Sequence, residues 1–211
     1  MNGMEYIDRL VEVLERTGIP YAIVGGLAAI AWGVPRFTQD VDLVATLPVA
    51  LEKLTQLGEE MATSGLSAME PTHFAELAFS SVDNGVTLSF MTPSIEKIDI
   101  SPTGRSEAGR VAATVLGMRC RLETAGGQEA WFATPEGTII GKLYFYWLGS
   151  DRQMRDVASI LQVQTAAGRE LDLRAIGEWA RGHNAGLYQA WIETLDAVGI
   201  EQGLDLRQAT A

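Results

Sequence analysis

Apolar residues at helical spacing open the chain, and a short continuous apolar segment follows them. Between residues 7 and 14 the apolar side chains follow the i, i+3, i+4, i+7 spacing of one helix face. Gly18 and Pro20 are typical of a helix end. Residues 21–24 (YAIV) then predict a short strand that runs directly into Gly25-Gly26.

The same alternation of segments continues to residue 65. Residues 27–32 (LAAIAW) predict a short buried helix that a glycine and a proline end. Residues 40–45 (DVDLVA) predict a second strand, and Pro48 opens a helix with an apolar stripe from Leu51 to Met61. The first part of the chain is therefore expected in the order helix, strand, helix, strand, helix.

The pattern changes after His73, where a β-hairpin is expected. Two apolar runs, FAELAFSSV and VTLSFM, flank Asp83-Asn84-Gly85, and an Asn-Gly pair is typical of a tight type I′ turn. Further strands are expected at 96–101, around 118–124 and around 128–134.

From Thr134 onward the sequence predicts only helices. Thr134 is a candidate N-cap, with Pro135 in the first helical position. The expected helices cover residues 135–149, 151–164, 171–182 and 185–199. The fold class is therefore α/β (α+β), with a mixed sheet flanked by helices in residues 1–133 and a C-terminal helical region in residues 134–211.

Gly25 and Gly26 lie between a predicted strand and a predicted helix. Without side chains there, a phosphate can approach backbone N–H groups at the positive end of the helix. A Gly-Gly pair is more often only a tight turn. The pair alone is therefore weak evidence for phosphate binding.

Three acidic residues on predicted strands are the candidate metal ligands. Asp40 and Asp42 are two positions apart, so both carboxylates are expected on one strand face. Two adjacent carboxylates repel, and a divalent cation removes that penalty. Asp99 is a candidate third carboxylate, on another strand and facing away from its isoleucine neighbours. The alternative is that these acids are solvent-exposed strand residues.

Composition limits the kind of metal site and the class of partner. The chain has 211 residues, one cysteine and two histidines, so a metal would need oxygen ligands. The formal net charge of -11 argues against broad binding to nucleic-acid backbone or an anionic membrane. The one basic stretch, residues 97–121, has five basic and two acidic residues. No apolar run approaches the roughly 20 residues that span a bilayer, so we expect a cytoplasmic protein.

The strand, the glycine pair and the acids together resemble a known signature. Gly25-Gly26, thirteen intervening residues and then Asp-Val-Asp-Leu resemble the polymerase-beta-like nucleotidyltransferase superfamily. The run PRFTQDVDL is similar to its minimal-nucleotidyltransferase branch, and residues 133–161 are similar, more loosely, to AbiEii-type toxin nucleotidyltransferases. Two departures from the toxins are Ser159, where they often carry a second acid, and the lack of a long C-terminal extension.

The resemblance implies a role for each matching residue. Gly25 and Gly26 would contact the nucleotide triphosphate, with Arg36 and Thr38 as further nucleotide-binding residues. The metal ligands would be Asp40, Asp42 and Asp99, and Asp99 is also a candidate general base. Lys142 would contact phosphate, and Asp156 would orient that lysine or the nucleotide. From the residues alone, Lys142 is equally a lysine whose stem packs on a helix, and Arg155-Asp156 an ordinary surface pair.

The expected activity is Mg²⁺-dependent transfer of a nucleoside monophosphate from an NTP such as ATP to an acceptor hydroxyl. Two Mg²⁺ ions would serve as cofactors. The acceptor is open between an RNA end, a protein side chain and a small molecule, and an antitoxin-like protein is a candidate partner. The alternatives are a non-catalytic relative that binds nucleotide or a partner, and a purely structural α/β module.

Overall fold

The computed structural model describes residues 4–93 and 97–200. The helices are α1 (Met4–Arg16), α2 (Gly25–Ala31), α3 (Leu51–Thr63), α4 (Phe74–Asn84), α5 (Glu107–Gly117), α6 (Pro135–Trp147), α7 (Arg152–Ala166), α8 (Leu173–His183) and α9 (Ala185–Ala197), with a 3₁₀ turn at Pro71–His73. The strands are β1 (Tyr21–Val24), β2 (Val41–Ala45), β3 (Ser67–Ala68), β4 (Leu88–Met91), β5 (Lys97–Pro102), β6 (Arg119–Glu123) and β7 (Glu129–Ala133).

The strands form one mixed sheet with the order β3-β4-β5-β2-β1-β7-β6. At its centre, β2 pairs antiparallel with β1 and parallel with β5. This arrangement is the mixed sheet flanked by helices and followed by a helical region that the sequence predicts.

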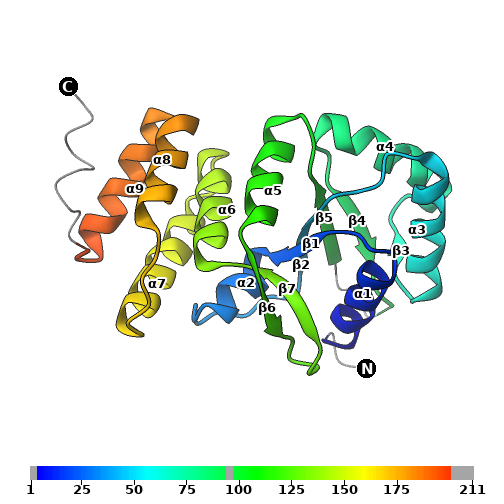
Figure 1. Ribbon diagram of the computed structural model, residues 1–211, viewed down its shortest axis with the longest axis horizontal. Coiled ribbons are helices and arrows are strands. Elements are labelled where there is room, and N and C mark those ends of the chain that lie inside the picture. The colour runs from blue at the N-terminus through cyan, green and yellow to red at the C-terminus, as the bar shows by residue number, and fades with distance from the viewer. Residues whose placement is uncertain (1–3, 94–96, 201–211) are drawn as a thin grey trace.

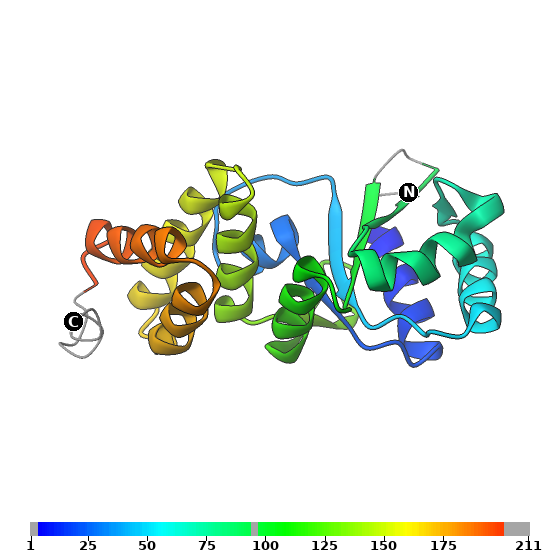
Figure 2. The ribbon, with the colours of Figure 1, turned by 90° about the horizontal axis from the view of Figure 1, so that it is seen from above.

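Two apolar cores lie on opposite faces of the sheet. On one face α1, α3 and α4 cover the alternating strand residues that include Leu43 and Ile98 (Figure 1). On the other face α5 and α6 pack against residues that include Ala22 and Val44, with α7, α8 and α9 farther out (Figure 2). Because strand side chains alternate between the faces, the strand residues adjacent to Leu43 and Ile98 are directed toward α5 and α6.

The C-terminal helices begin immediately after the sheet. Strand β7 ends at Ala133, and the hydroxyl of Thr134 accepts a hydrogen bond from the backbone N–H of Gly137 at 3.3 Å. The second core crosses this junction, because Trp32 of the α/β part and the buried Trp191 of α9 belong to the same apolar cluster. The separation at residue 133 into two parts stays a prediction.

The predicted hairpin around residue 84 is wrong. Residues 74–84 form α4, which buries Phe74, Ala78 and Ser81 at helical spacing, and only the second run becomes a strand, β4. Gly85 has φ of 69° and ends the helix in the left-handed conformation. An Asn-Gly pair suits a helix C-terminus as well as a type I′ turn, since both require positive φ.

No helix in residues 4–93 and 97–200 combines the length and the apolar character needed to cross a bilayer.

Candidate active site

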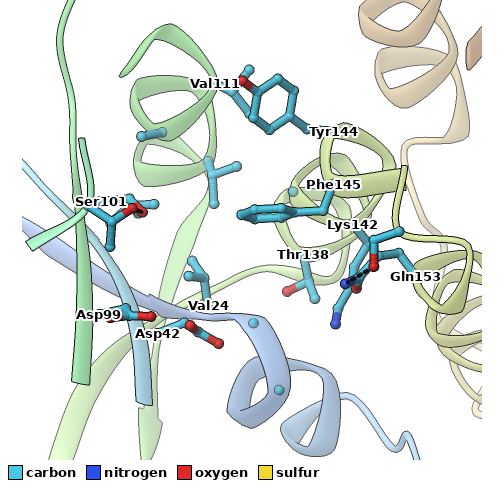
Figure 3. A pocket seen from close by; sticks show the side chains of 18 of the residues that line it. Val24, Asp42, Asp99, Ser101, Val111, Thr138, Lys142, Tyr144, Phe145 and Gln153 are labelled. Atoms are coloured by element: carbon cyan, nitrogen blue, oxygen red, sulfur yellow. Dashed lines mark hydrogen bonds between the residues drawn. The ribbon is translucent and has the colours of Figure 1, made fainter. Parts of the chain in front are cut away.

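The two central acids of the sheet lie side by side. In the parallel pairing of β2 with β5, Asp42 is the register partner of Asp99. Their strand neighbours Leu43 and Ile98 are buried in the opposite core, so both carboxylates are on the face toward α5 and α6 (Figure 3). The pairing of strands thus brings together two of the three predicted metal ligands.

These carboxylates line a cavity of about 500 Å³ between the sheet, α5 and α6. All of the predicted nucleotide and metal residues except Asp156 are among its lining residues, namely Gly25, Gly26, Arg36, Thr38, Asp40, Asp42, Asp99 and Lys142. Residues separated by up to 117 positions in the sequence therefore share one concave site of the size typical for small ligands.

The charged form of Asp42 is unfavourable in this site. Burial, followed by the negative charges of Asp99 and Asp40, raises the pKa of its carboxyl group. A hydrogen bond from the backbone N–H of Gly26 and the charge of Lys142 act in the opposite direction. A bound cation would relieve the repulsion among the carboxylates.

Asp99 already has two partners. Ser89 donates its hydroxyl to Oδ1 at 2.6 Å, and the Nζ of Lys97 lies 2.8 Å from Oδ2. The hydrogen bond to Asp99 raises the pKa of Lys97, so the lysine stays charged. Lys97 and Ser89 are functional candidates that the sequence reasoning missed. Strand alternation, which puts Lys97 on the face of Asp99, is the signal that could have found the first.

The carboxylate oxygens of the site are ligands of the type that a hard divalent cation prefers. Asp40 precedes β2, is exposed and lines the same cavity as Asp42 and Asp99, and carboxylate oxygens are the ligands that Mg²⁺ prefers. In residues 4–93 and 97–200, however, no group of three histidine, cysteine or acidic side chains is assembled closely enough to hold a metal ion. The three-carboxylate ligand set therefore stays a prediction.

The two glycines sit where side chains would collide with the site. Gly25 opens α2 with φ of 62°, and a Cβ built there would overlap Oδ2 of Asp42. A Cβ on Gly26 would lie 2.7 Å from the Oγ1 of Thr38. The glycines thus allow Asp42 and the loop before β2 to approach the start of α2.

A buried ion-pair cluster forms another part of the site. Lys142 of α6 donates to Oδ2 of Asp156 on α7 at 2.6 Å, and Arg36 reaches the same oxygen at 2.8 Å. Lys142 is only 5% exposed, so its ammonium group does not extend along a helix to solvent, and Asp156 is not a surface partner of Arg155. Burial lowers the pKa of Lys142, and the hydrogen bond to Asp156 opposes that effect. One carboxylate therefore holds two cations beside the cavity.

Three of the five basic residues in the stretch 97–121 contact acidic or aromatic side chains. Lys97 pairs with Asp99, and Arg121 pairs with Glu15 at 2.7 Å. Arg119 and Arg121 both lie over the ring of Trp131.

Comparison with known proteins identifies the fold. No protein-family model matches the sequence, and no curated protein matches it significantly. Among solved structures, ANT(2'')-Ia in complex with adenylyl-2''-tobramycin has a TM-score of 0.54 and 14% identity, over 90% of this chain and 97% of that one. A solution structure of the antibiotic-resistance factor ANT(2'')-Ia gives 0.52 and 14%, over 92% and 91%. An antigenic nucleotidyltransferase-like protein from Paracoccidioides brasiliensis gives 0.52 and 18%, over 89% and 92%. The chain therefore has the fold of these proteins along nearly its whole length.

Proposed function

We propose that this protein is a Mg²⁺-dependent nucleotidyltransferase that moves a nucleoside monophosphate from an NTP to an acceptor hydroxyl. The observation that carries the proposal is the register pairing of Asp42 with Asp99 at a cavity that also receives Gly25, Gly26 and Lys142. The similarity in fold to a nucleotidyltransferase-like protein and to a protein bound to adenylyl-2''-tobramycin supports this reaction class.

The proposed transfer is a displacement at phosphorus. The acceptor oxygen forms a bond to the α-phosphorus of the NTP, the bond from that phosphorus to the β-phosphate oxygen breaks, and pyrophosphate leaves with the electron pair. Asp99 lies at the cavity and is the candidate acceptor for the hydroxyl proton. Catalysis of this kind consists mainly of positioning and charge neutralisation.

Asp40, Asp42 and Asp99 are the residues that would hold Mg²⁺. When bound, the metal supplies charge neutralisation for the phosphate oxygens and lowers the pKa of the attacking hydroxyl. Two observations support this assignment: the three groups are oxygen donors, and the charges of Asp99 and Asp40 raise the pKa of Asp42, a repulsion that a cation would relieve.

The cations opposite the carboxylates would bind the triphosphate. Lys142 and Arg36 both line the cavity, and Asp156 holds them through one shared oxygen. Asp156 is therefore assigned to positioning these two side chains. Thr38 lines the cavity as well, and its hydroxyl donates to the backbone carbonyl of Asp40 at 3.4 Å.

Release of pyrophosphate from ATP, and separately from the other NTPs, tests the proposal in the presence of Mg²⁺ and a mixed pool of hydroxyl acceptors. The Asp40→Asn, Asp42→Asn double variant should lose at least about 100-fold in rate, because removing a metal-held charge costs several kcal/mol of transition-state stabilisation. An Asp83→Asn variant, which changes an exposed acid of α4, is the matched control. Full activity of the double variant would refute the mechanism.

A second candidate is a relative that binds nucleotide without transferring it. Its support is that both oxygens of Asp99 already interact with Ser89 and Lys97. Calorimetry and the pyrophosphate assay together separate the two candidates. A non-catalytic relative would bind NTP and release no pyrophosphate with any acceptor.

The proposal extends to a toxin-like role with an antitoxin-like partner, on the similarity of residues 133–161 to AbiEii-type toxins. We also place the protein in the cytoplasm, where its NTP substrate is available. Expression of the chain alone should then arrest growth, and expression of the Asp40→Asn, Asp42→Asn variant should not. Normal growth with active enzyme would refute this role.

A further inference from the structure

Charge is distributed unevenly over the cavity wall. The charged lining residues belong to β2, β5, the loop before β2 and the facing parts of α6 and α7, and they are Arg36, Asp40, Asp42, Asp99, Lys142 and Arg152. No charged residue of α5 is among the lining residues that the structure describes. Asp42 and Asp99 lie at one end of the cavity, and Val111 and Tyr144 lie at the other (Figure 3).

Two helix faces with small and apolar residues form this second end. From α5 the cavity is lined at i, i+3, i+4 and i+7 by Ala108, Val111, Ala112 and Val115. At this end α6 contributes Gly141, Tyr144 and Phe145, and Leu148 follows the last residue of the helix. The nearest atom to a Cβ built on Gly141 would be a methyl group of Val115 at 3.9 Å, so the two helices leave space between them.

Phe145 projects into this space. Its side chain extends from α6 toward β5, above the level of the carboxylates (Figure 3). Phe145 is 52% exposed and Leu148 is 59% exposed, although both line a cavity. Covering a large exposed apolar side chain with an apolar ligand removes that surface from water, which stabilises the complex.

The composition of this wall separates the classes of acceptor. A polycationic alcohol needs acidic partners around its ammonium groups, and the α5 and α6 lining residues provide none. A nucleic-acid end needs a row of lysine and arginine residues, whereas this chain has a net charge of -11 and Lys97 is already paired with Asp99. An uncharged apolar body is the chemistry that fits.

We propose that the acceptor is a compact, uncharged alcohol or phenol whose apolar body binds between α5 and α6 against Phe145. This inference rests on the proposed function and names its acceptor class. The hydroxyl of that molecule is directed toward Asp42 and Asp99, where its oxygen forms the bond to the α-phosphorus, pyrophosphate leaves and the proton passes to Asp99.

The test uses the full chain with Mg²⁺ and a non-transferable NTP analogue. Calorimetry measures binding of the analogue first, and ligand-observed NMR then measures binding of 2-phenylethanol, tobramycin and mixed tRNA. We expect 2-phenylethanol to bind, and to bind at least about fivefold more weakly to Phe145→Ala and Leu148→Glu, since each change removes apolar contact. Both positions are exposed, so these variants should fold. Trp147→Ala, which changes a 45% exposed residue of α6 that is not among the lining residues, should bind like the original chain.

The outcomes distinguish this inference from the proposed function. Binding of the NTP analogue without binding of 2-phenylethanol overturns the acceptor class alone, as does binding of 2-phenylethanol that Phe145→Ala leaves unchanged. Binding of tobramycin or tRNA in its place identifies a charged acceptor and also overturns the inference. Failure of the NTP analogue to bind overturns the proposed function together with the acceptor class.

Discussion

Asp42 and Asp99 lie side by side as register partners on the adjacent parallel strands β2 and β5. They are 57 positions apart in the sequence, and the sheet brings them to one face. Burial and the charge of Asp99 are the two largest causes that raise the pKa of Asp42. The pair is therefore unfavourable for the stability of the protein without a cation and suited to binding one.

Asp42→Asn should stabilise the protein in a metal-free buffer at neutral pH. Because the folded-state pKa of Asp42 is raised above its ordinary value of 3.8, the folded state holds this proton more tightly than the unfolded state. The resulting stabilisation is fully present below pH 3.8 and is lost as pH rises through the raised pKa. Asparagine does not ionise, so the variant does not lose stability at this position as pH rises.

Thermal unfolding in EDTA at a series of pH values from 3 to 8 measures the effect. The variant should have a higher Tm than the original chain at neutral pH, with a weaker decline as pH increases. Asp83→Asn is the control for removing one negative charge. An Asp42→Asn variant that is less stable than the original at neutral pH would contradict the electrostatic account.

Gly25→Ala should disrupt the site more than Gly18→Ala. Both glycines have positive φ, 62° and 66°, so each substitution incurs the backbone penalty of about 1–2 kcal/mol. Only at Gly25 does the new Cβ overlap a neighbour, the carboxylate of Asp42, whereas nothing lies within 4 Å at Gly18. Gly25→Ala should therefore lose pyrophosphate release that Gly18→Ala retains. Urea denaturation compares the stability of the two variants. Equal losses of pyrophosphate release in both variants would rule out the overlap as the cause.

The Lys142–Asp156 pair should show strong coupling in a double-mutant cycle. Asp156→Leu leaves the 5% exposed Lys142 without its carboxylate, at a cost of about 3–5 kcal/mol in the free energy of unfolding. Adding Lys142→Met should recover part of that loss because the buried charge is then absent.

The same cycle on the exposed Arg174–Glu178 pair of α8 is the matched control. It should give a coupling of no more than about 0.5 kcal/mol. Additive effects of Lys142→Met and Asp156→Leu would show that the two groups do not stabilise each other.

Lys97→Met should lower the Mg²⁺ concentration that gives half-maximal pyrophosphate release. The Nζ of Lys97 lies 2.8 Å from Oδ2 of Asp99 and competes with a metal for that oxygen. Because the lysine is 44% exposed, the expected change is modest, about two- to fivefold. A Mg²⁺ titration checks this, with Lys53→Met on the exposed side of α3 as the control. A higher Mg²⁺ requirement in Lys97→Met would indicate that the lysine assists the transfer.

Local patterns were sufficient for most elements and for the direction of the strand side chains. The alternation in DVDLVA and EKIDIS correctly directs Asp42 and Asp99 away from their buried neighbours, because side chains in a strand alternate with period two. The same reasoning failed at Asn84-Gly85, because helix ends and tight hairpins both require a residue with positive φ. In this segment the helical spacing of Phe74, Ala78 and Ser81 indicates the helix that the structure contains.

The sequence by itself determined the chemical groups, their strand faces and the glycines beside them. Only the tertiary structure decided that β5 lies next to β2 with Asp99 level with Asp42, and that Lys97 and Ser89 occupy the oxygens of Asp99. It also decided that α6 and α7 bring Lys142 and Asp156 together with Arg36, and that α5 closes the cavity with an apolar wall. The reason is that local periodicity is set by backbone geometry within one segment, whereas strand order, register and helix packing depend on how distant segments bury one another's surfaces.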